Sequence, residues 1–458
     1  MKMTPTINIQ QEVQPHFKDV WVGKQPYNIL YGGRNSFKSS VVALKLARLM
    51  IDQIVHGRKA NIVVIRKVGN TIRDSVFQKI QWALKKFGMV GRFSATVSPF
   101  KITHKQTGST FYFYGSDDFQ KLKSNDINDI IAVWYEESAE FQNAEEFDQT
   151  NIIFMRQKQK YVPHVKFYWS YNPPRNPYAW INEWVAEKRG DPNYLVDYSS
   201  YLDDELGLLK DNGGQILDEI NRIKNNDYDY YRYIYLGEAV GYDSNVYNID
   251  LFKPLDELPS DDPLRYVAYS LDGGHSQSAT TVSLYGITQK DNVILLDTLY
   301  YSPSGQTLKK SPSQLAKMVY NWIVKQNKDP RWGHVEVIKR TIDSAEAALK
   351  NQYAVDYGIS WHPVAKKKKQ EMIDYVHSLV ASGRFYYLNT PANEIWYVQH
   401  RDYRYDDKTI NTDDPKVIKE DDHTVDQTQY FVLDNAALLG LKYLSLIHIS
   451  EPTRPERI

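Results

Sequence analysis

Short apolar runs alternate with amphipathic segments along the first part of the chain. Residues 27–31 form a β-prone run before a glycine-containing turn, residues 39–50 have a helical pattern, and residues 61–65 are continuously apolar. Continuous apolar runs are typical of strands buried on both faces in a parallel sheet. Further strands are predicted at 101–104, 110–114, 130–135 and 165–170, the first two as a hairpin. This alternation of strands and helices predicts an α/β domain.

The pattern changes in residues 191–262, which are rich in Asp, Asn and Tyr and end in a proline-flanked polar stretch. We interpret this region as a linker subdomain. The pattern then restarts with three consecutive strands at 266–271, 281–287 and 293–300. Helices at 312–326, 345–353, 367–382, 392–400 and 424–443 follow, with strands at 335–342, 360–364 and 385–388 between them. Three strands in succession followed by α/β alternation is the order found in RNase H-like folds.

The predicted organisation therefore has five parts. They are an N-terminal segment at 1–24, an α/β domain at 25–190, the linker subdomain at 191–262, a second α/β domain at 263–444, and a tail at 445–458. The tail loses all periodicity and is left out of the fold prediction.

The amino-acid composition excludes several kinds of catalytic and metal site. The 458 residues contain no cysteine, which excludes disulfides, thiolate catalysis and iron–sulfur clusters. Lys and Arg together number 56, as do Asp and Glu, so the chain does not hold nucleic acid by bulk charge. Local basic patches remain, at residues 366–369 and at Lys121 and Lys123. No apolar run approaches the roughly 18 residues of a membrane span, and the N-terminus has no signal-peptide pattern, so we expect a soluble cytoplasmic protein.

The turn after the first predicted strand fits the phosphate-binding pattern G-x-x-x-x-G-K-[ST] except at one position. It consists of Gly32, Gly33, Arg34, Asn35, Ser36, Phe37, Lys38 and Ser39. In such loops, backbone N–H groups hold phosphates at a helix N-terminus, the lysine neutralises β- and γ-oxygens, and the serine hydroxyl binds Mg²⁺. Phe37 stands where the pattern has a glycine that permits close backbone approach. Two interpretations remain open, an ATP-binding loop and a tight turn with a helix-capping serine.

Two acids follow the predicted strand at 130–135. ATPases require one carboxylate near Mg²⁺ and another that orients and deprotonates the attacking water. We predict Glu136 as the metal-side residue and Glu137 as the catalytic residue. The segment Ser170-Tyr171-Asn172-Pro173-Pro174, at the end of the next strand, is predicted as a polar sensor at the C-terminal edge of the sheet. The alternatives are solvated acids at a strand end and a simple proline turn.

Eight segments resemble, in their order, the motifs of tailed-phage terminase large subunits of the PBSX-like kind. Five lie in the first half (GGRNSFKSS, VVIRK, KLKS, VWYEES and SYNPP), and three in the second: LDGG at 271–274, IDSAE at 342–346 and DDHTVDQTQY at 421–430. The resemblance covers residues 25–435. It implies an N-terminal P-loop ATPase domain plus a C-terminal RNase H-like nuclease domain. The implied function is ATP-driven packaging of double-stranded viral DNA into a procapsid, with metal-dependent endonucleolytic cutting of concatemers.

The same resemblance implies the nuclease residues, which are Asp272, Asp343 and Asp426 as principal metal ligands and catalytic groups, with His423 as an auxiliary ligand or proton carrier. Two-metal nucleases gather carboxylates around Mg²⁺ or Mn²⁺. Helical spacing places His423 and Asp422 near the face that bears Asp426. Each acid is also explained as a helix or turn cap. Asp297 is a weaker candidate, because it lies inside a strand.

The resemblance further implies partners, namely double-stranded DNA, a terminase small subunit, the portal protein of the procapsid, and further copies of the chain assembled on that portal. It implies a place in the host cell cytoplasm and none in a membrane or the mature virion. Two alternatives stay open. One is an RNase H-like transposase or recombinase, which needs a DNA-end-binding module that the sequence does not show. The other is a docking protein with an inactive ATPase domain, for which Phe37 is the best support.

Overall fold

The computed structural model describes residues 8–115, 127–210, 214–274, 278–304 and 309–441. These residues form two compact units. Unit 1 holds the described residues up to Ile220 together with Tyr231–Gly241, and unit 2 holds Asn221–Tyr230 and the described residues from Tyr242 onward. Within the described ranges, no helix is both long enough and apolar enough to cross a membrane. The predicted tail at 445–458 and the basic pair Lys121 and Lys123 lie outside the described residues.

Unit 1 is built on an eight-stranded sheet in the order β3-β4-β5-β2-β6-β7-β1-β8. Its strands are β1 (Tyr27–Gly32), β2 (Asn61–Arg66), β3 (Phe93–Val97), β4 (Phe100–His104), β5 (Thr110–Gly115), β6 (Ile130–Glu136), β7 (Lys166–Tyr171) and β8 (Tyr194–Ser199). The strands from β5 to β8 along this order pair in parallel, and β3, β4 and β5 form an antiparallel meander. The predicted strands all occur, which confirms the α/β prediction for this half of the chain.

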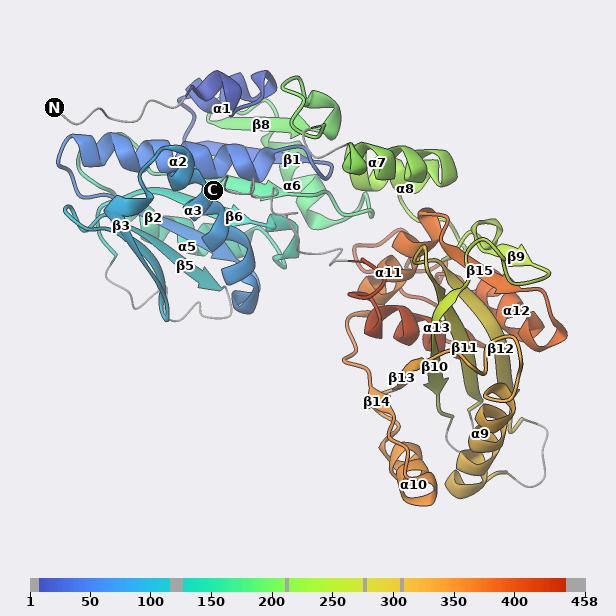
Figure 1. Cartoon of the computed structure of the whole chain (residues 1–458). Helices are drawn as coiled ribbons and strands as arrows, with labels where there is room; N and C mark the ends of the chain where they lie inside the picture. The colour runs from blue at the N-terminus through green and yellow to red at the C-terminus, as the bar shows by residue number, and fades with distance from the viewer. Residues whose placement is uncertain (1–7, 116–126, 211–213, 275–277, 305–308, 442–458) are drawn as a thin grey trace. The chain divides into compact units, whose positions relative to one another are not determined.

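Helices cover both faces of this sheet. They are α1 (Lys18–Val22), α2 (Lys38–Val55), α3 (Gln78–Lys86), α5 (Glu145–Arg156) and α6 (Trp180–Lys188). Figure 1 shows α2 running along the sheet. One hydrophobic core joins α2 and α3 to the sheet, and a second core joins α5 and α6 to the other side. Burial on both faces explains why the interior positions of β2 and β6 are continuously apolar rather than alternating.

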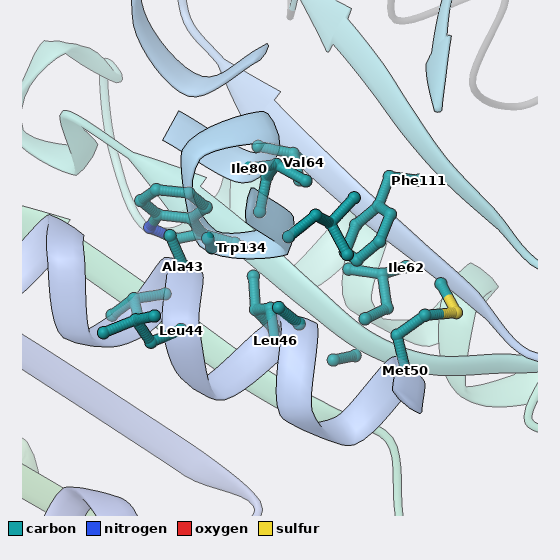
Figure 2. Packing of buried hydrophobic residues seen from close by; sticks show 14 of the residues in the cluster. Ala43, Leu44, Leu46, Met50, Ile62, Val64, Ile80, Phe111 and Trp134 are labelled. Carbon is teal, nitrogen blue, oxygen red and sulfur yellow. The ribbon is translucent and has the colours of Figure 1, made fainter. Parts of the chain in front are cut away.

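The first of these cores is shown from close by in Figure 2. Leu46 and Met50 project from α2 toward side chains of the central strands. Trp134 of β6 is fully buried there, and its indole N–H donates a 2.8 Å hydrogen bond to the Ser170 hydroxyl of β7. The polar edge of the indole is thus satisfied inside an apolar layer, as buried donors require. This packing fixes the position of α2 on the sheet, and therefore the position of the loop that precedes the helix.

Residues 191–262, predicted as a linker subdomain, are divided between the two units. β8 pairs in parallel with β1 over Tyr194–Ser199, so it is the edge strand of the first sheet. The chain then enters α7 (Gln215–Asn226) and α8 (Tyr228–Tyr231), returns to unit 1 for a π-helical turn at Arg232–Leu236, and leaves again after Gly241. The strand at 194–199 was not predicted, because its polar and aromatic residues hide the short β pattern.

Unit 2 contains a seven-stranded mixed sheet in the order β14-β13-β10-β11-β12-β15-β9. The strands are β9 (Lys253–Leu255), β10 (Leu264–Asp272), β11 (Thr280–Thr288), β12 (Val293–Tyr301), β13 (Val337–Ile342), β14 (His362–Pro363) and β15 (Phe385–Leu388). β10, β11 and β12 are antiparallel, whereas β13 pairs with β10 in parallel. The predicted start of three consecutive strands is confirmed.

The helices of unit 2 are α9 (Pro312–Gln326), α10 (Ala347–Tyr357), α11 (Lys369–Ala381), α12 (Glu394–Asp402) and α13 (His423–Asp434). α9 and α10 pack on one face of the sheet, and α11, α12 and α13 pack on the other. The last helix was predicted to reach residue 443 but ends at Asp434. The side-chain amide of Asn435 donates to the Phe431 carbonyl at 2.8 Å and satisfies a terminal acceptor of the helix.

We expect Leu46→Ala to destabilise unit 1 by about 2–5 kcal/mol, because it leaves a cavity in a close-packed core. Leu46 is fully buried, whereas Val55 on the same helix is 70% exposed. Val55→Ala is therefore the matched control and should change stability by less than about 0.5 kcal/mol. Scanning calorimetry of the full chain measures both; equal shifts for the two variants would contradict the packing.

Candidate nucleotide and metal sites

The phosphate-binding pattern lies between β1 and α2, in the strand–turn–helix context that it requires. Two glycines allow the loop to pass close to other backbone. A Cβ on Gly32 would lie 1.8 Å from the Ser199 carbonyl oxygen, and one on Gly33 would lie 1.8 Å from the Tyr235 carbonyl oxygen. The Gly33 N–H donates to Ser199 at 3.1 Å and the Arg34 N–H donates to Ile234 at 2.8 Å. The edge strand and the π-helical turn thus hold the first half of the loop.

Phe37, the departure from the pattern, adopts φ 65° and ψ 0° immediately before α2. This is the left-handed conformation that glycine favours and that costs other residues about 1–2 kcal/mol. The Phe37 ring is half-buried against the core beneath α2, which offsets part of this cost. Asn35 is also left-handed, at φ 59°, and asparagine tolerates that region well. The loop therefore reaches its conformation although Phe37 stands at the position of the second glycine in the pattern.

Lys38 is the first residue of α2, and its ammonium group points back into the loop. Nζ donates to the carbonyl oxygens of Gly32 at 3.2 Å and Gly33 at 3.0 Å, and to the Ser36 hydroxyl at 3.3 Å. A fourth bond, of 2.6 Å, reaches the Asn172 side-chain oxygen. Burial lowers the pKa of Lys38, while the charges of Glu137 and Glu136 oppose that shift. The structure thus brings the predicted loop lysine and the predicted polar sensor together.

The two acids after β6 have different surroundings. Glu136 forms a 3.0 Å ion pair with Arg66 at the end of β2, and both side chains are at most 2% exposed. Arg66 also donates to the Ser75 hydroxyl at 2.8 Å. Glu137 has φ 54°, which turns the chain as it leaves the strand. Burial and the neighbouring Glu136 charge raise the pKa of Glu137, while Arg66 and Lys38 oppose the rise.

The geometry around Lys38 suits phosphate chemistry. Ser39 is the second residue of α2, where backbone N–H groups have no acceptor within the helix. Its hydroxyl and the Glu136 carboxylate are hard oxygen donors of the kind that Mg²⁺ prefers. Glu137, with its raised pKa, has the proton affinity that a general base needs near neutral pH. Arg66 is fully buried in its ion pair, so the structure gives it a positioning role toward Glu136.

A second site lies in unit 2, at the edge where β10 and β13 end. Asp272 is the last residue of β10, and Asp343 follows β13 directly. The two strands pair in parallel, and the Asp343 N–H donates to the Leu271 carbonyl at 3.3 Å. Asp426 lies in the first turn of α13, which packs across β10, β11 and β13. The sheet register and one helix therefore bring three acids that are distant in sequence to one edge.

His423, the first residue of α13, contacts Asp272. Its Nδ1 lies 2.9 Å from Asp272 Oδ2, and its Nε2 lies 3.2 Å from the Ser278 hydroxyl. Burial raises the pKa of Asp272 to about 6, although the hydrogen bond from His423 opposes the rise. The same hydrogen bond raises the pKa of His423. The charges of Asp426 and Asp343 also raise the pKa of Asp272.

Lysines hold the other two acids. Lys366 Nζ lies 2.6 Å from Asp343 Oδ2, and Lys369 Nζ lies 2.5 Å from Asp426 Oδ1. The Tyr430 hydroxyl also reaches Asp343 Oδ2, at 3.3 Å. In this arrangement, no three His, Asp or Glu side chains of the described residues converge closely enough to hold a metal. The donor set nevertheless fits Mg²⁺ or Mn²⁺ in its chemistry, because it consists of carboxylate oxygens and one imidazole.

The structure supports the capping interpretation for Asp343 but not for Asp422. Asp422 occupies the N-cap position of α13 but makes no capping hydrogen bond with its side chain. Asp343 Oδ1 accepts the Ala345 N–H at 2.9 Å, so this carboxylate does order a turn, although the helix begins only at Ala347. Asp297 accepts a 2.9 Å hydrogen bond from Gln326 and is a structural partner.

Sequence reasoning missed one acid beside this site. Glu346 is only 6% exposed, and its carboxylate packs so closely on Gly273 that a Cβ there would lie 2.6 Å from Oε2. Its position three residues after Asp343, in the segment IDSAE, was the available signal. Its N–H donates to the Asp343 carbonyl at 3.0 Å. Glu346 can therefore pack in this position only because residue 273 is a glycine without a Cβ.

Comparison with family models gives two matches. The model described as phage terminase large subunit matches residues 24–238, and the model described as terminase RNAseH like domain matches residues 272–434. The terminase large subunit of Bacillus phage SPP1 is 26% identical over 439 residues, covering 93% of this chain and 96% of that protein. The PBSX phage terminase large subunit of Bacillus subtilis (strain 168) is 35% identical over 133 residues, 29% of each chain.

Solved structures agree on the fold. The large terminase from a thermophilic bacteriophage has a TM-score of 0.72 at 20% identity, covering 95% of this chain and 99% of that one. A second structure of that protein, in complex with ADP, has a TM-score of 0.69, also at 20% identity, and covers 94% and 100%. These findings confirm the predicted fold class, an N-terminal P-loop ATPase domain plus a C-terminal RNase H-like domain.

We expect the pKa of His423 to fall in Asp272→Asn, because the hydrogen bond with Asp272 is the main cause of its increase. In the wild type, the His423 side of this pair is lost as the pH rises through its raised folded-state pKa, and the ionised Asp272 takes up a proton as the pH falls through about 6, so the ion pair is complete only between these limits. NMR titration of the imidazole in EDTA measures the shift, with His423→Gln to assign the signal. An identical His423 titration in both proteins would contradict the pairing.

Proposed function

Because this chain belongs to the phage terminase large subunit family, we propose that it packages double-stranded viral DNA into a procapsid and cuts concatemeric DNA. ATP hydrolysis in unit 1 would drive translocation, and a metal-dependent endonuclease in unit 2 would make the cuts. The observation that carries this proposal is the presence of two separate charged sites in one chain. One surrounds the loop lysine Lys38, and the other gathers Asp272, Asp343 and Asp426.

The residues of unit 1 fit ATP hydrolysis. The Lys38 ammonium would exchange its bonds to loop carbonyls for the β- and γ-phosphate oxygens, while N–H groups at the start of α2 hold the phosphates. Ser39 and Glu136 would hold Mg²⁺, which neutralises charge that develops on the phosphates. Glu137 would take the proton of the attacking water, consistent with its raised pKa. Support also comes from the large terminase of the thermophilic bacteriophage, whose structures include complexes with ADP and ATP-γ-S.

The residues of unit 2 fit phosphodiester cutting. Asp272, Asp343 and Asp426 would hold Mg²⁺ or Mn²⁺, which would activate water and stabilise the leaving oxygen. His423 is oriented by Asp272 and would act as an auxiliary ligand or move a proton at its Nε2 atom. The Glu346 side chain packs against Gly273, beside Asp272. We expect hydrolysis that tolerates many DNA sequences, because nothing in the sequence resembles a base-reading module.

The partners follow from the family. We propose double-stranded DNA as the substrate, a terminase small subunit and the portal protein of the procapsid as protein partners, and several copies of the chain acting together on the portal. The site of action would be the cytoplasm of the infected host cell. Phe37 adopts the left-handed conformation that the glycine of the pattern would take, so the loop keeps its geometry. For this reason we favour an active ATPase domain over a docking protein without turnover.

Lys38→Ala is expected to lower Mg-ATP turnover by about 10²–10³-fold, because the cation that faces the phosphates is lost. Steady-state hydrolysis with and without linear duplex DNA measures it. Arg48→Ala is the matched control on the same helix, since Arg48 is exposed and pairs with Asp52, one turn further along α2. Equal turnover in wild type and Lys38→Ala would exclude this loop as the ATP site.

Asp343→Asn is expected to reduce cutting of linear duplex DNA by on the order of 10²-fold or more, because a metal ligand loses its charge. Gel assays in Mg²⁺ or Mn²⁺ measure the loss, and EDTA should abolish cutting by the wild type. Asp297→Asn serves as the control, because Asn can still accept the bond from Gln326. Undiminished cutting by Asp343→Asn would show that the nuclease site lies elsewhere.

A further inference from the structure

Two lysines form ion pairs with carboxylates that are proposed to bind metal. Lys366 pairs with Asp343 and Lys369 pairs with Asp426, at 2.6 and 2.5 Å. The acid side chains are only 10% and 21% exposed, whereas the lysine side chains are 36% and 27% exposed. The carboxylate side of each pair is therefore screened by water and salt less than on an open surface, while the ammonium groups still reach solvent.

The run of four lysines at 366–369 is divided by the fold. Lys367 turns to Glu371, 3.1 Å away and one helical turn along α11. Lys366, in the loop before α11, and Lys369, its first residue, instead face the proposed metal ligands. A solvated charge run, the ordinary interpretation of such a sequence, would show no such division. Lys366 and Lys369 therefore belong to the site, and Lys367 does not.

We propose that Lys366 and Lys369 compete with the divalent metal for Asp343 and Asp426, and that the displaced ammonium groups then contact the DNA phosphate. This inference rests on the proposed nuclease function of the same site. An ammonium 2.6 Å from a carboxylate oxygen occupies the position of a ligand-bound cation, and two cations at that distance repel each other. Metal binding therefore requires the lysines to move.

The displaced groups cannot move far. The Lys366 ammonium lies over the Tyr430 ring, 5.0 Å from its centre. Lys369 is anchored at the start of α11 and also donates to the Gln429 side-chain oxygen at 3.2 Å. Each ammonium group stays within one side-chain length of the acids. Once the carboxylates bind the metal, an incoming phosphodiester would replace them as the anionic partner of the two ammonium groups.

The test is Mn²⁺ binding, measured by calorimetric titration of the full chain without DNA. Lys366→Met and Lys369→Met keep an unbranched side chain but remove the charge, so each should bind Mn²⁺ about tenfold more tightly than the wild type. Lys367→Met is the matched control from the same run and should bind like the wild type. Lys366→Arg retains the charge and should also stay near wild-type affinity, which guards against a folding defect in the Met variant.

The second measurement is cutting of linear duplex DNA at saturating Mn²⁺. The Lys366→Met and Lys369→Met proteins should cut more slowly although they bind metal more tightly, and Lys367→Met should cut normally. Mn²⁺ affinity that is unchanged or weaker in Lys366→Met would overturn the competition. Tighter metal binding with undiminished cutting would overturn the phosphate contact. A wild-type chain that binds no Mn²⁺ would instead contradict the proposed metal site itself.

Discussion

Parallel strand pairing in a fixed register is the constraint on which both sites depend. In unit 1, Tyr31 of β1 lies beside Tyr171 of β7, and Ser170 lies beside Glu136 of β6. The chain segments that follow these strands therefore leave the sheet at one edge, where Lys38 and Asn172 meet. In unit 2, the parallel pairing of β10 with β13 does the same for Asp272 and Asp343. Backbone hydrogen bonds thus bring together charged groups that would otherwise repel or stay in water.

Burial gives these charged groups their chemistry. Water is largely excluded around Lys38 and Glu137, so the pKa of the lysine falls and that of the acid rises. Burial likewise raises the pKa of Asp272 to about 6, against the opposing bond from His423. Charges placed in such surroundings require nearby partners, and the structure supplies Arg66 for Glu136 and the two lysines for Asp343 and Asp426. The partners limit the repulsion between acids that the fold crowds together.

Much of the fold was predictable, because long apolar runs and clear helical periods reflect burial directly. The strands at 61–65 and 130–135 and the helix at 312–326 were found in this way. β8 was not found, because its short apolar run is interrupted by Asp197 and ends at Ser199, and only its pairing with β1 makes it a strand. The division of residues 191–262 between two units was hidden for the same reason, since no local pattern records which body a segment packs against.

The order of the motifs, the residue types of both sites and the family resemblance could be read from the chain alone, because these depend on local spacing and on residue chemistry. The partner that each charged group takes depends instead on the folded arrangement. It paired Arg66 with Glu136, set Glu346 against Gly273, and turned Lys366 and Lys369 toward the acids while Lys367 turned away. These choices depend on strand register and helix orientation, which arise from contacts between residues far apart in the chain. A linear sequence of four identical lysines holds no record of those contacts.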